Sequence, residues 1–358
     1  MISSEGQATL NTAGDDAATL AALGWSEFFA QQVAQQELSL TPPVRIVAIQ
    51  RSGLHVIGAG IDETLPPRAD VAVGDWLLYD PLQPRRNRVL HRKSLISRRA
   101  PGSGREQQLI AANIDTAFIV TSCNEDFNLA RLERYAAMIM TAAIEPVIVL
   151  TKADLATEVA SWIAAARGVV AGIEAVALDA RGDQAAQALA PWLRAGATLA
   201  MLGSSGVGKS TLGNALLGRQ LIATQGIRED DAKGRHTTTH RQLHLLAGGC
   251  VLLDTPGMRE LQLSDAAAGV AETFTDIHNL AANCRFADCQ HGGEPGCAVQ
   301  QAVAAQQLDP ARVQRWRKLL AESAFNAASL AERRHKERAF GKMVRRVSKE
   351  IAAQRKDE

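Results

Sequence analysis

The sequence lacks the features that would place a protein in a membrane or outside the cell. No apolar run approaches the roughly 18 residues that a membrane-spanning helix needs. Residues 1–40 contain five acidic side chains and no Lys or Arg, so the basic start of a secretory signal is missing. The 358 residues are 46% hydrophobic and 22% charged, which is typical of globular proteins. We therefore expect a cytoplasmic protein of two or three domains, without a membrane partner.

Net charge is also nearly absent, at +1, but the basic residues are unevenly distributed. Residues 81–105 contain eight Lys or Arg and no acid, and residues 331–358 contain ten against five acids. Two basic segments on a nearly neutral protein favour a localised contact with a polyanion, above all nucleic acid. The alternative is a solvated loop and a solvated helix face.

Cysteine is scarce: the chain has only five, and three of them fall between residues 284 and 297. Cys284, Cys289, His291 and Cys297 follow the spacing C-x4-C-x-H-x5-C. Three thiolates and one imidazole complete a tetrahedral zinc shell with no open position, which predicts one structural zinc ion. The surrounding tail has few core-forming residues, so the metal would contribute folding free energy. The alternative is a loop of reduced cysteines.

The pattern changes along the chain and predicts a multidomain α/β protein. Residues 1–40 are an N-terminal extension in which 25–36 predict one short amphipathic helix. Residues 41–97 contain short strand-like runs that suit an OB-type β-barrel, although an SH3-like barrel would look much the same. Residues 105–264 alternate strands and helices, which favours a parallel sheet covered by helices. Residues 265–358 are helical around the Cys/His cluster and end in a basic helix.

A phosphate-binding loop is predicted at residues 203–210, where GSSGVGKS matches G-x-x-x-x-G-K-S. An apolar strand precedes it and a helical pattern follows, as the motif requires. Backbone N–H groups of such a loop point at phosphate oxygens, and the helix dipole adds to the attraction. Lys209 would neutralise the β- and γ-phosphates, and Ser210 would ligate Mg²⁺. The predicted nucleotide-binding residues here are Gly203, Ser204, Ser205, Gly206, Val207, Gly208, Lys209, Ser210 and Thr211.

Two later segments complete a nucleotide site. DTPG at 254–257 ends an apolar strand, where Asp254 would hold Mg²⁺ through water and Gly257 would donate its N–H to the γ-phosphate. KGRHTTTHR at 233–241 suits a mobile switch in which Thr238 closes onto Mg²⁺. Taken alone, the first segment is also a plain turn and the second a flexible basic loop.

The stretch TKAD at 151–154 follows a strand and predicts guanine recognition. Asp154 could accept hydrogen bonds from N1–H and the 2-amino group of guanine, which adenine lacks, and Lys152 would lie along the base. The usual motif begins with Asn, and the usual supporting hydroxyl is missing at Ala177-Leu178. Both departures predict reduced nucleotide affinity rather than a different base. The predicted base-binding residues are Thr151, Lys152, Ala153 and Asp154.

The order of these motifs is unusual, because the base-recognition motif precedes the phosphate loop. The order matches that of a GTPase whose front half has been moved to the back. A cut and rejoin in surface loops can preserve a sheet, since packing depends on neighbours in space. The chain then leaves the GTPase core directly after its second switch, so the tail is tied to the element that senses the γ-phosphate.

Together, the barrel, the permuted motifs and the zinc spacing resemble the ribosome small-subunit-dependent GTPase A (RsgA) family over residues 25 to 345. The resemblance implies a GTPase that binds the small ribosomal subunit late in its maturation and is released on GTP hydrolysis. It implies stimulation by that subunit, contacts of the barrel and the zinc domain with ribosomal RNA, and Mg²⁺ bound with GTP. We expect a monomer.

Met258 stands where many GTPases carry a Gln that orients water, so hydrolysis by the isolated protein is expected to be slow. The resemblance implies that His236 takes over this role on the ribosome. His236, Lys209 and Thr238 are then the predicted catalytic residues, and the alternative for His236 is a solvated loop histidine.

Two other functions remain open. The chain would be a zinc-dependent RNA-binding protein if its nucleotide binding were only regulatory, but the intact Lys209, Ser210 and Asp254 count against this. It would be an ATP-using enzyme if the base site accepted adenine, which Asp154 disfavours.

Overall fold

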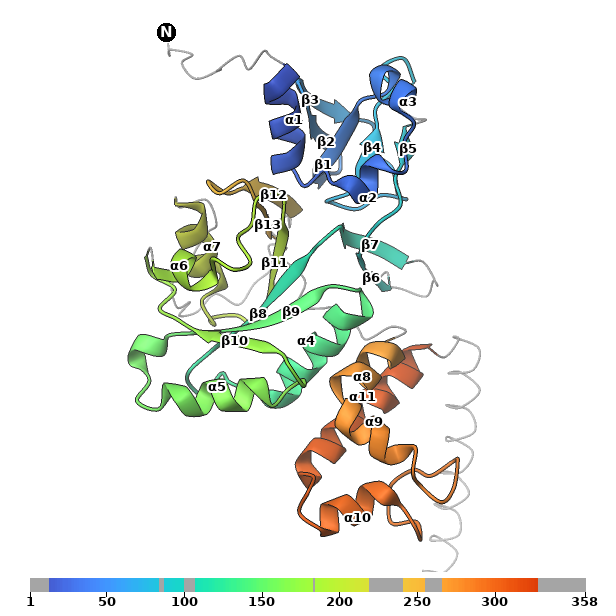
Figure 1. Cartoon of the computed structure of the whole chain (residues 1–358), viewed down its shortest axis with the longest axis vertical. Helices are drawn as coiled ribbons and strands as arrows, with labels where there is room; N and C mark the ends of the chain where they lie inside the picture. The colour runs from blue at the N-terminus through green and yellow to red at the C-terminus, as the bar shows by residue number, and fades with distance from the viewer. Residues whose placement is uncertain are drawn as a thin grey trace, which may run out of the picture.

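One long sheet runs through the computed structural model, which describes residues 13–83, 87–99, 107–182, 184–218, 241–254 and 266–327 (Figure 1). Its strand order is β10-β9-β8-β11-β13-β12-β1-β2-β3. The first six strands of this order belong to the section predicted to be α/β. They are β8 (Thr116–Ser122), β9 (Glu145–Thr151), β10 (Glu174–Ala177), β11 (Thr198–Leu202), β12 (Arg241–Leu245) and β13 (Val251–Asp254).

The central section is a sheet covered by helices on both faces, as the alternating pattern predicts, but it is mixed rather than wholly parallel. The pairs from β10 to β13 are parallel, and β12 joins β13 antiparallel. The strands are continuous apolar runs because helices bury both of their sides. One face packs on α4 (Leu129–Thr141) and α5 (Val159–Arg167), and the other on α6 (Gln184–Leu189) and α7 (Lys209–Leu217).

The N-terminal section is a five-stranded antiparallel unit with the order β3-β2-β1-β4-β5. Alternating apolar residues of these strands face one core, which contains Val44, Ile46, Leu54 and Val56. Among the described residues no pairing joins β5 to β3, so closure into the predicted OB-type barrel stays a prediction. The strands are β1 (Pro43–Gln50), β2 (Gly53–Gly58), β3 (Ile61–Leu65), β4 (Trp76–Leu78) and β5 (Arg88–Val89).

Strand β1 also pairs with β12, through Ala48↔Gln242 and Ile49↔Arg241. The N-terminal unit and the central sheet are therefore hydrogen-bonded to each other, which domain boundaries drawn from sequence motifs do not predict. The short hairpin of β6 (Leu95–Arg99) and β7 (Gln107–Ala112) leads from one unit to the other.

The first forty residues contain more helix than the one short helix expected over 25–36. The structure has α1 (Ala13–Ala22), α2 (Glu27–Ala30) and α3 (Gln35–Leu40). Gly24, with φ 91°, makes the left-handed turn that separates α1 from α2. Trp25 and Phe29 then pack on Trp76 of β4, with a ring-centroid distance of 4.9 Å for the two tryptophans. This aromatic contact holds the extension against the N-terminal sheet.

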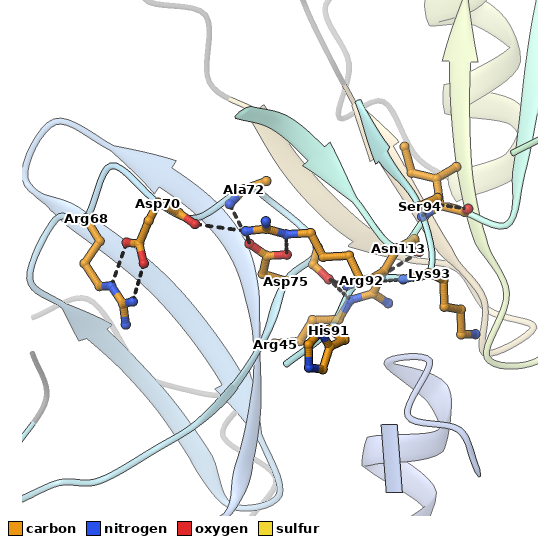
Figure 2. A network of polar contacts seen from close by, with 12 residues as sticks. Arg45, Arg68, Asp70, Ala72, Asp75, His91, Arg92, Lys93, Ser94 and Asn113 are labelled. Atoms are coloured by element: carbon orange, nitrogen blue, oxygen red, sulfur yellow. Dashed lines mark hydrogen bonds and ion pairs between the residues drawn. The ribbon is translucent and has the colours of Figure 1, made fainter. Parts of the chain in front are cut away.

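A buried polar network joins the N-terminal unit to the central sheet (Figure 2). Arg45 of β1 is only 1% exposed and donates to Leu23 O, Gly74 O, Asn113 O and Thr198 Oγ1. Burial lowers the pKa of Arg45 to about 10, with Asp115 and Asp75 opposing the shift, so the side chain is charged at neutral pH. One buried cation on β1 therefore ties the turn after α1 to the start of β11.

The C-terminal section is helical, as predicted, and the described residues after 265 contain no strand. It consists of α8 (Ala267–Thr273), α9 (Thr275–Ala281), α10 (Ala298–Ala304) and α11 (Pro310–Ala327). The predicted basic helix within 331–358 lies outside the described residues. Across the part of the chain that the structure describes, no helix is both long and apolar enough to span a bilayer.

Helix α4 lies between the central sheet and the C-terminal helices (Figure 1). Glu133 on α4 is buried and bonds Arg312 at 3.1 Å and Arg315 at 2.7 Å, both on α11. Arg134, the next residue, pairs with Glu322 at 2.6 Å. Burial raises the pKa of Glu133, and the two guanidinium groups oppose that shift. The interface between these units is thus polar as well as apolar.

Candidate nucleotide site and metal centre

The predicted phosphate loop forms at the carboxyl end of β11 and opens into α7. Gly203 and Gly208 adopt φ values of 147° and 92°, in the left-handed region that favours glycine. A Cβ on Gly203 would lie 2.2 Å from Val120 O, so only glycine fits there. Lys209 Nζ donates to Ser204 O and therefore folds back over the loop. Sequence and structure agree on this element.

The predicted base-recognition motif lies beside this loop, although the two motifs are far apart in the chain. β9 and β11 flank β8, so their carboxyl ends share one edge of the sheet. Thr151 is fully buried, and its Oγ1 lies 2.6 Å from Val207 O of the phosphate loop and 3.1 Å from Thr121 O. The threonine hydroxyl at the position of the usual Asn thus ties the two loops together.

Thr151→Val is expected to weaken GDP binding about two- to tenfold without unfolding the protein. Valine keeps the shape but leaves Val207 O without its donor, and such a hydrogen bond contributes about 0.5–1.5 kcal/mol. Titration with a fluorescent GDP analogue measures the effect. Thr116→Val, at the opposite end of the sheet, is the matched control. Equal affinity of both variants and the parent protein would contradict this role of Thr151.

The predicted base-supporting segment, Ala177-Leu178, lies beside the base-recognition motif, where Ala153 N–H donates to Leu178 O at 3.3 Å. Ala177 ends β10 and Leu178 is buried, where its N–H donates to Leu150 O. The polar residues Asp179 and Arg181 follow, and Arg181 Nη2 lies 2.6 Å from Asp154 Oδ2. The contact of Arg181 with Asp154 was not predicted.

A further contact to the phosphate loop was not predicted. Arg131 in the first turn of α4 donates to Ser204 Oγ, and the Asn128 side chain caps this turn by accepting from Arg131 N at 3.0 Å. An arginine on a helical pattern carries no sequence signal for such a contact. It adds a positive charge beside the loop.

Several predicted site residues lie outside the described residues. These are His236 and Thr238 of the switch segment, Gly257 of DTPG and Met258. The backbone of Asp254 ends β13, the strand parallel to β11, but its side chain is not described. The geometry of the Mg²⁺ and catalytic positions therefore stays a prediction.

The predicted metal-binding residues come together in the C-terminal section. The ligand atoms of Cys284, Cys289, His291 and Cys297 all lie within 4.8 Å of one another. The His291 ring packs on Trp316 of α11, with a centroid distance of 5.1 Å. Three thiols and one imidazole in this arrangement could hold a metal ion.

The turn that carries His291 is held by Glu294, a residue that sequence reasoning did not assign. The Glu294 carboxylate accepts from the backbone of Gln290 at 2.9 Å, Gly292 at 2.7 Å and Gly293 at 3.1 Å. These N–H groups, together with its own, hold the pKa of Glu294 at about 2. His291 adopts φ 56°, a left-handed conformation that such a turn requires.

Comparison with known proteins places the chain among GTPases. The RsgA GTPase family model matches residues 89–264. A Vibrio vulnificus protein named small ribosomal subunit biogenesis GTPase RsgA 2 is 48% identical over 335 residues, covering 92% of this chain and 95% of that protein. A Mesorhizobium japonicum protein named small ribosomal subunit biogenesis GTPase RsgA is 49% identical over 317 residues, covering 86% and 91%.

Two crystallised proteins have the same fold. YjeQ from Thermotoga maritima aligns with a TM-score of 0.56 at 22% identity, covering 79% of this chain and 98% of its own. YloQ, described as a circularly permuted GTPase, aligns with a TM-score of 0.54 at 22% identity, covering 83% and 99%. The permuted order inferred from the motifs is therefore confirmed.

Proposed function

Because this chain belongs to the RsgA GTPase family, we propose that its GTP hydrolysis serves late assembly of the small ribosomal subunit. The observation that carries the proposal is the hydrogen bond from Thr151 to Val207 O. It joins the base-recognition motif to the phosphate loop, although their order along the chain is permuted. GTP would keep the protein on the subunit, and hydrolysis would release it. The relatives named above are small ribosomal subunit biogenesis GTPases, which supports this partner.

We assign base recognition to Asp154 and phosphate binding to the loop around Lys209. A guanine base offers N1–H and a 2-amino group to the Asp154 carboxylate, and adenine offers neither. Ser210 would hold Mg²⁺ with GTP, together with Thr238 and Asp254, and Gly257 would donate to the γ-phosphate. His236 would position the attacking water on the ribosome.

The distances among the ligand atoms support zinc as the metal. Tetrahedral bonds of about 2.3 Å to sulfur and about 2.0 Å to nitrogen separate two sulfurs by about 3.8 Å, and sulfur from nitrogen by about 3.5 Å. Cys284 Sγ and Cys297 Sγ lie 3.9 Å apart, and each lies 3.5 Å from His291 Nδ1. Four protein ligands leave no open position, so the role is structural.

Glu294→Ala is expected to lower zinc affinity about tenfold, because groups that orient metal ligands commonly contribute 10–100-fold. Removing the carboxylate releases the turn that presents His291. Competition with a chromophoric zinc chelator measures the change. Asp288→Ala, in the same loop, removes an acid that makes no such set of backbone contacts and serves as the control. Identical zinc affinities of the two variants would argue against this role of Glu294.

We propose that the N-terminal unit and the zinc-binding section contact ribosomal RNA. Residues 81–105 contain eight Lys or Arg and no acid, and phosphate contacts of this kind dominate affinity for nucleic acid. A cytoplasmic monomer suits this partner.

The decisive experiment is GTP turnover with and without purified small ribosomal subunits. We expect slow turnover alone and at least tenfold stimulation by small but not large subunits. His236→Ala should retain GTP binding and lose the stimulation. Equal turnover with and without subunits would favour an RNA-binding protein with regulatory nucleotide binding, and displacement of bound GDP by ATP as readily as by GTP would overturn the base assignment.

A further inference from the structure

Arg181 forms an ion pair with Asp154, the residue that we assign to guanine recognition. Its Nη2 lies 2.6 Å from Asp154 Oδ2. Arg181 belongs to the loop after β10, and β10 pairs with β9, the strand that leads into Asp154. The contact therefore joins the two loops that border the base site.

The same guanidinium has a second carboxylate partner, Asp179. Arg181 Nε lies 2.9 Å from Asp179 Oδ1, and Nη2 lies 2.9 Å from Asp179 Oδ2. The Arg181 backbone N–H also donates to Asp179 Oδ1, at 2.9 Å. The pair with Asp179 is thus two-pronged and local, whereas the contact with Asp154 is a single bond between loops.

This asymmetry lets the bond to Asp154 break while Arg181 keeps a neutralising partner. The Arg181 side chain is 65% exposed and that of Asp154 is 26% exposed, so the guanidinium has solvent on one side into which it can withdraw. An exposed ion pair of this kind is weak, because water screens the two charges. A base that offers better-placed donors can displace it.

Guanine and arginine present the same chemistry to a carboxylate, namely adjacent N–H donors in one plane. We propose that Arg181 competes with guanine for Asp154. It engages Asp154 in the empty protein and remains on Asp179 alone when guanine binds. The inference rests on the proposed role of Asp154 as the guanine-recognition residue.

The competition lowers nucleotide affinity and gives Asp154 a cationic partner in the empty base site. Loss of Arg181 should therefore tighten nucleotide binding, whereas loss of a residue that contacts the nucleotide should weaken it.

The test is a double-mutant cycle on Arg181 and Asp179, measured by titration of the full chain with a fluorescent GDP analogue. We expect Arg181→Ala to bind GDP about two- to fivefold more tightly, the range that an exposed ion pair allows. Asp179→Asn keeps the turn but removes the competing charge, so Arg181 stays on Asp154 and binding weakens. The double variant should match Arg181→Ala, because Asp179 acts only through Arg181.

Arg167→Ala, on the distant end of α5, is the matched control and should bind GDP like the parent protein. High salt should narrow the difference between the parent and Arg181→Ala, because it screens the exposed pair. Asp154→Ala tests the role of Asp154 in base recognition separately from its competition with Arg181. If it leaves GDP affinity unchanged, the base assignment fails and the competition fails with it. If it abolishes binding but Arg181→Ala binds GDP equally or more weakly than the parent, only the competition is overturned.

Discussion

Removal of the proposed zinc ion is expected to unfold the C-terminal helices while the central sheet stays folded. Structural zinc contributes about 10–16 kcal/mol in small zinc-dependent peptides, which exceeds the stability of a typical domain. Cys284, Cys289 and Cys297 also pack against the apolar core of α8, α10 and α11, so loss of the ion separates ligands that belong to that core. The metal ligands are thus part of the apolar core of the C-terminal section.

Chelation followed by far-UV circular dichroism and limited proteolysis measures this effect. Helical signal should fall, and cleavage should concentrate after residue 265. The fluorescence of Trp316, which packs on His291, should shift as its environment opens. Cys289→Ser should mimic chelation, whereas Cys123→Ala, outside the cluster, should keep its metal. A metal-free protein with unchanged circular dichroism would contradict the structural role.

Replacement of Glu133 by alanine is expected to lower the free energy of unfolding by about 3 kcal/mol. Removing one partner of a buried ion pair commonly costs about 3–5 kcal/mol, because the remaining charge stays buried without compensation. Arg315 loses its close partner, since its contact with Asp309 is 3.9 Å long. Arg312 keeps Asp276 at 2.9 Å, which places the expected value at the lower end.

Urea denaturation, with the slope compared between variants, measures this loss. Glu133→Gln keeps the size and hydrogen-bonding capacity but removes the charge, so its loss should be smaller. Glu322→Ala, on the half-exposed pair with Arg134, should cost less than about 1 kcal/mol. A Glu133→Ala variant as stable as the parent protein would show that the buried pair contributes nothing.

The elements predicted well from sequence are those whose signal is local. The phosphate loop, the apolar strands and the Cys/His cluster are each defined by neighbouring residues, and the structure brings each together as expected. The contact of Thr151 with Val207 joins residues 56 positions apart, and the pairing of β1 with β12 joins still more distant ones. Such partners are set by the folded sheet and leave no periodic pattern.

The contact of Arg181 with Asp154 likewise has no local sequence signal. Leu178 is an apolar residue that continues the strand pattern, and the structure buries it one residue past β10. Asp179 and Arg181 come directly after it and look like an ordinary polar turn until β10 is placed beside β9. Similarly, an acid such as Glu133 on a helical pattern is indistinguishable from one facing solvent until α11 is placed beside it.

The pairing of β1 with β12 determines which fragments of this protein can be handled alone. Without the N-terminal unit, β12 would end the central sheet, and its free N–H and C=O groups would face solvent along one side. Unpaired strand edges are templates for aggregation. A fragment cut at residue 105 to isolate the nucleotide-binding section would therefore expose the unpaired edge of β12 and aggregate. A truncated protein has to retain β1 to stay soluble.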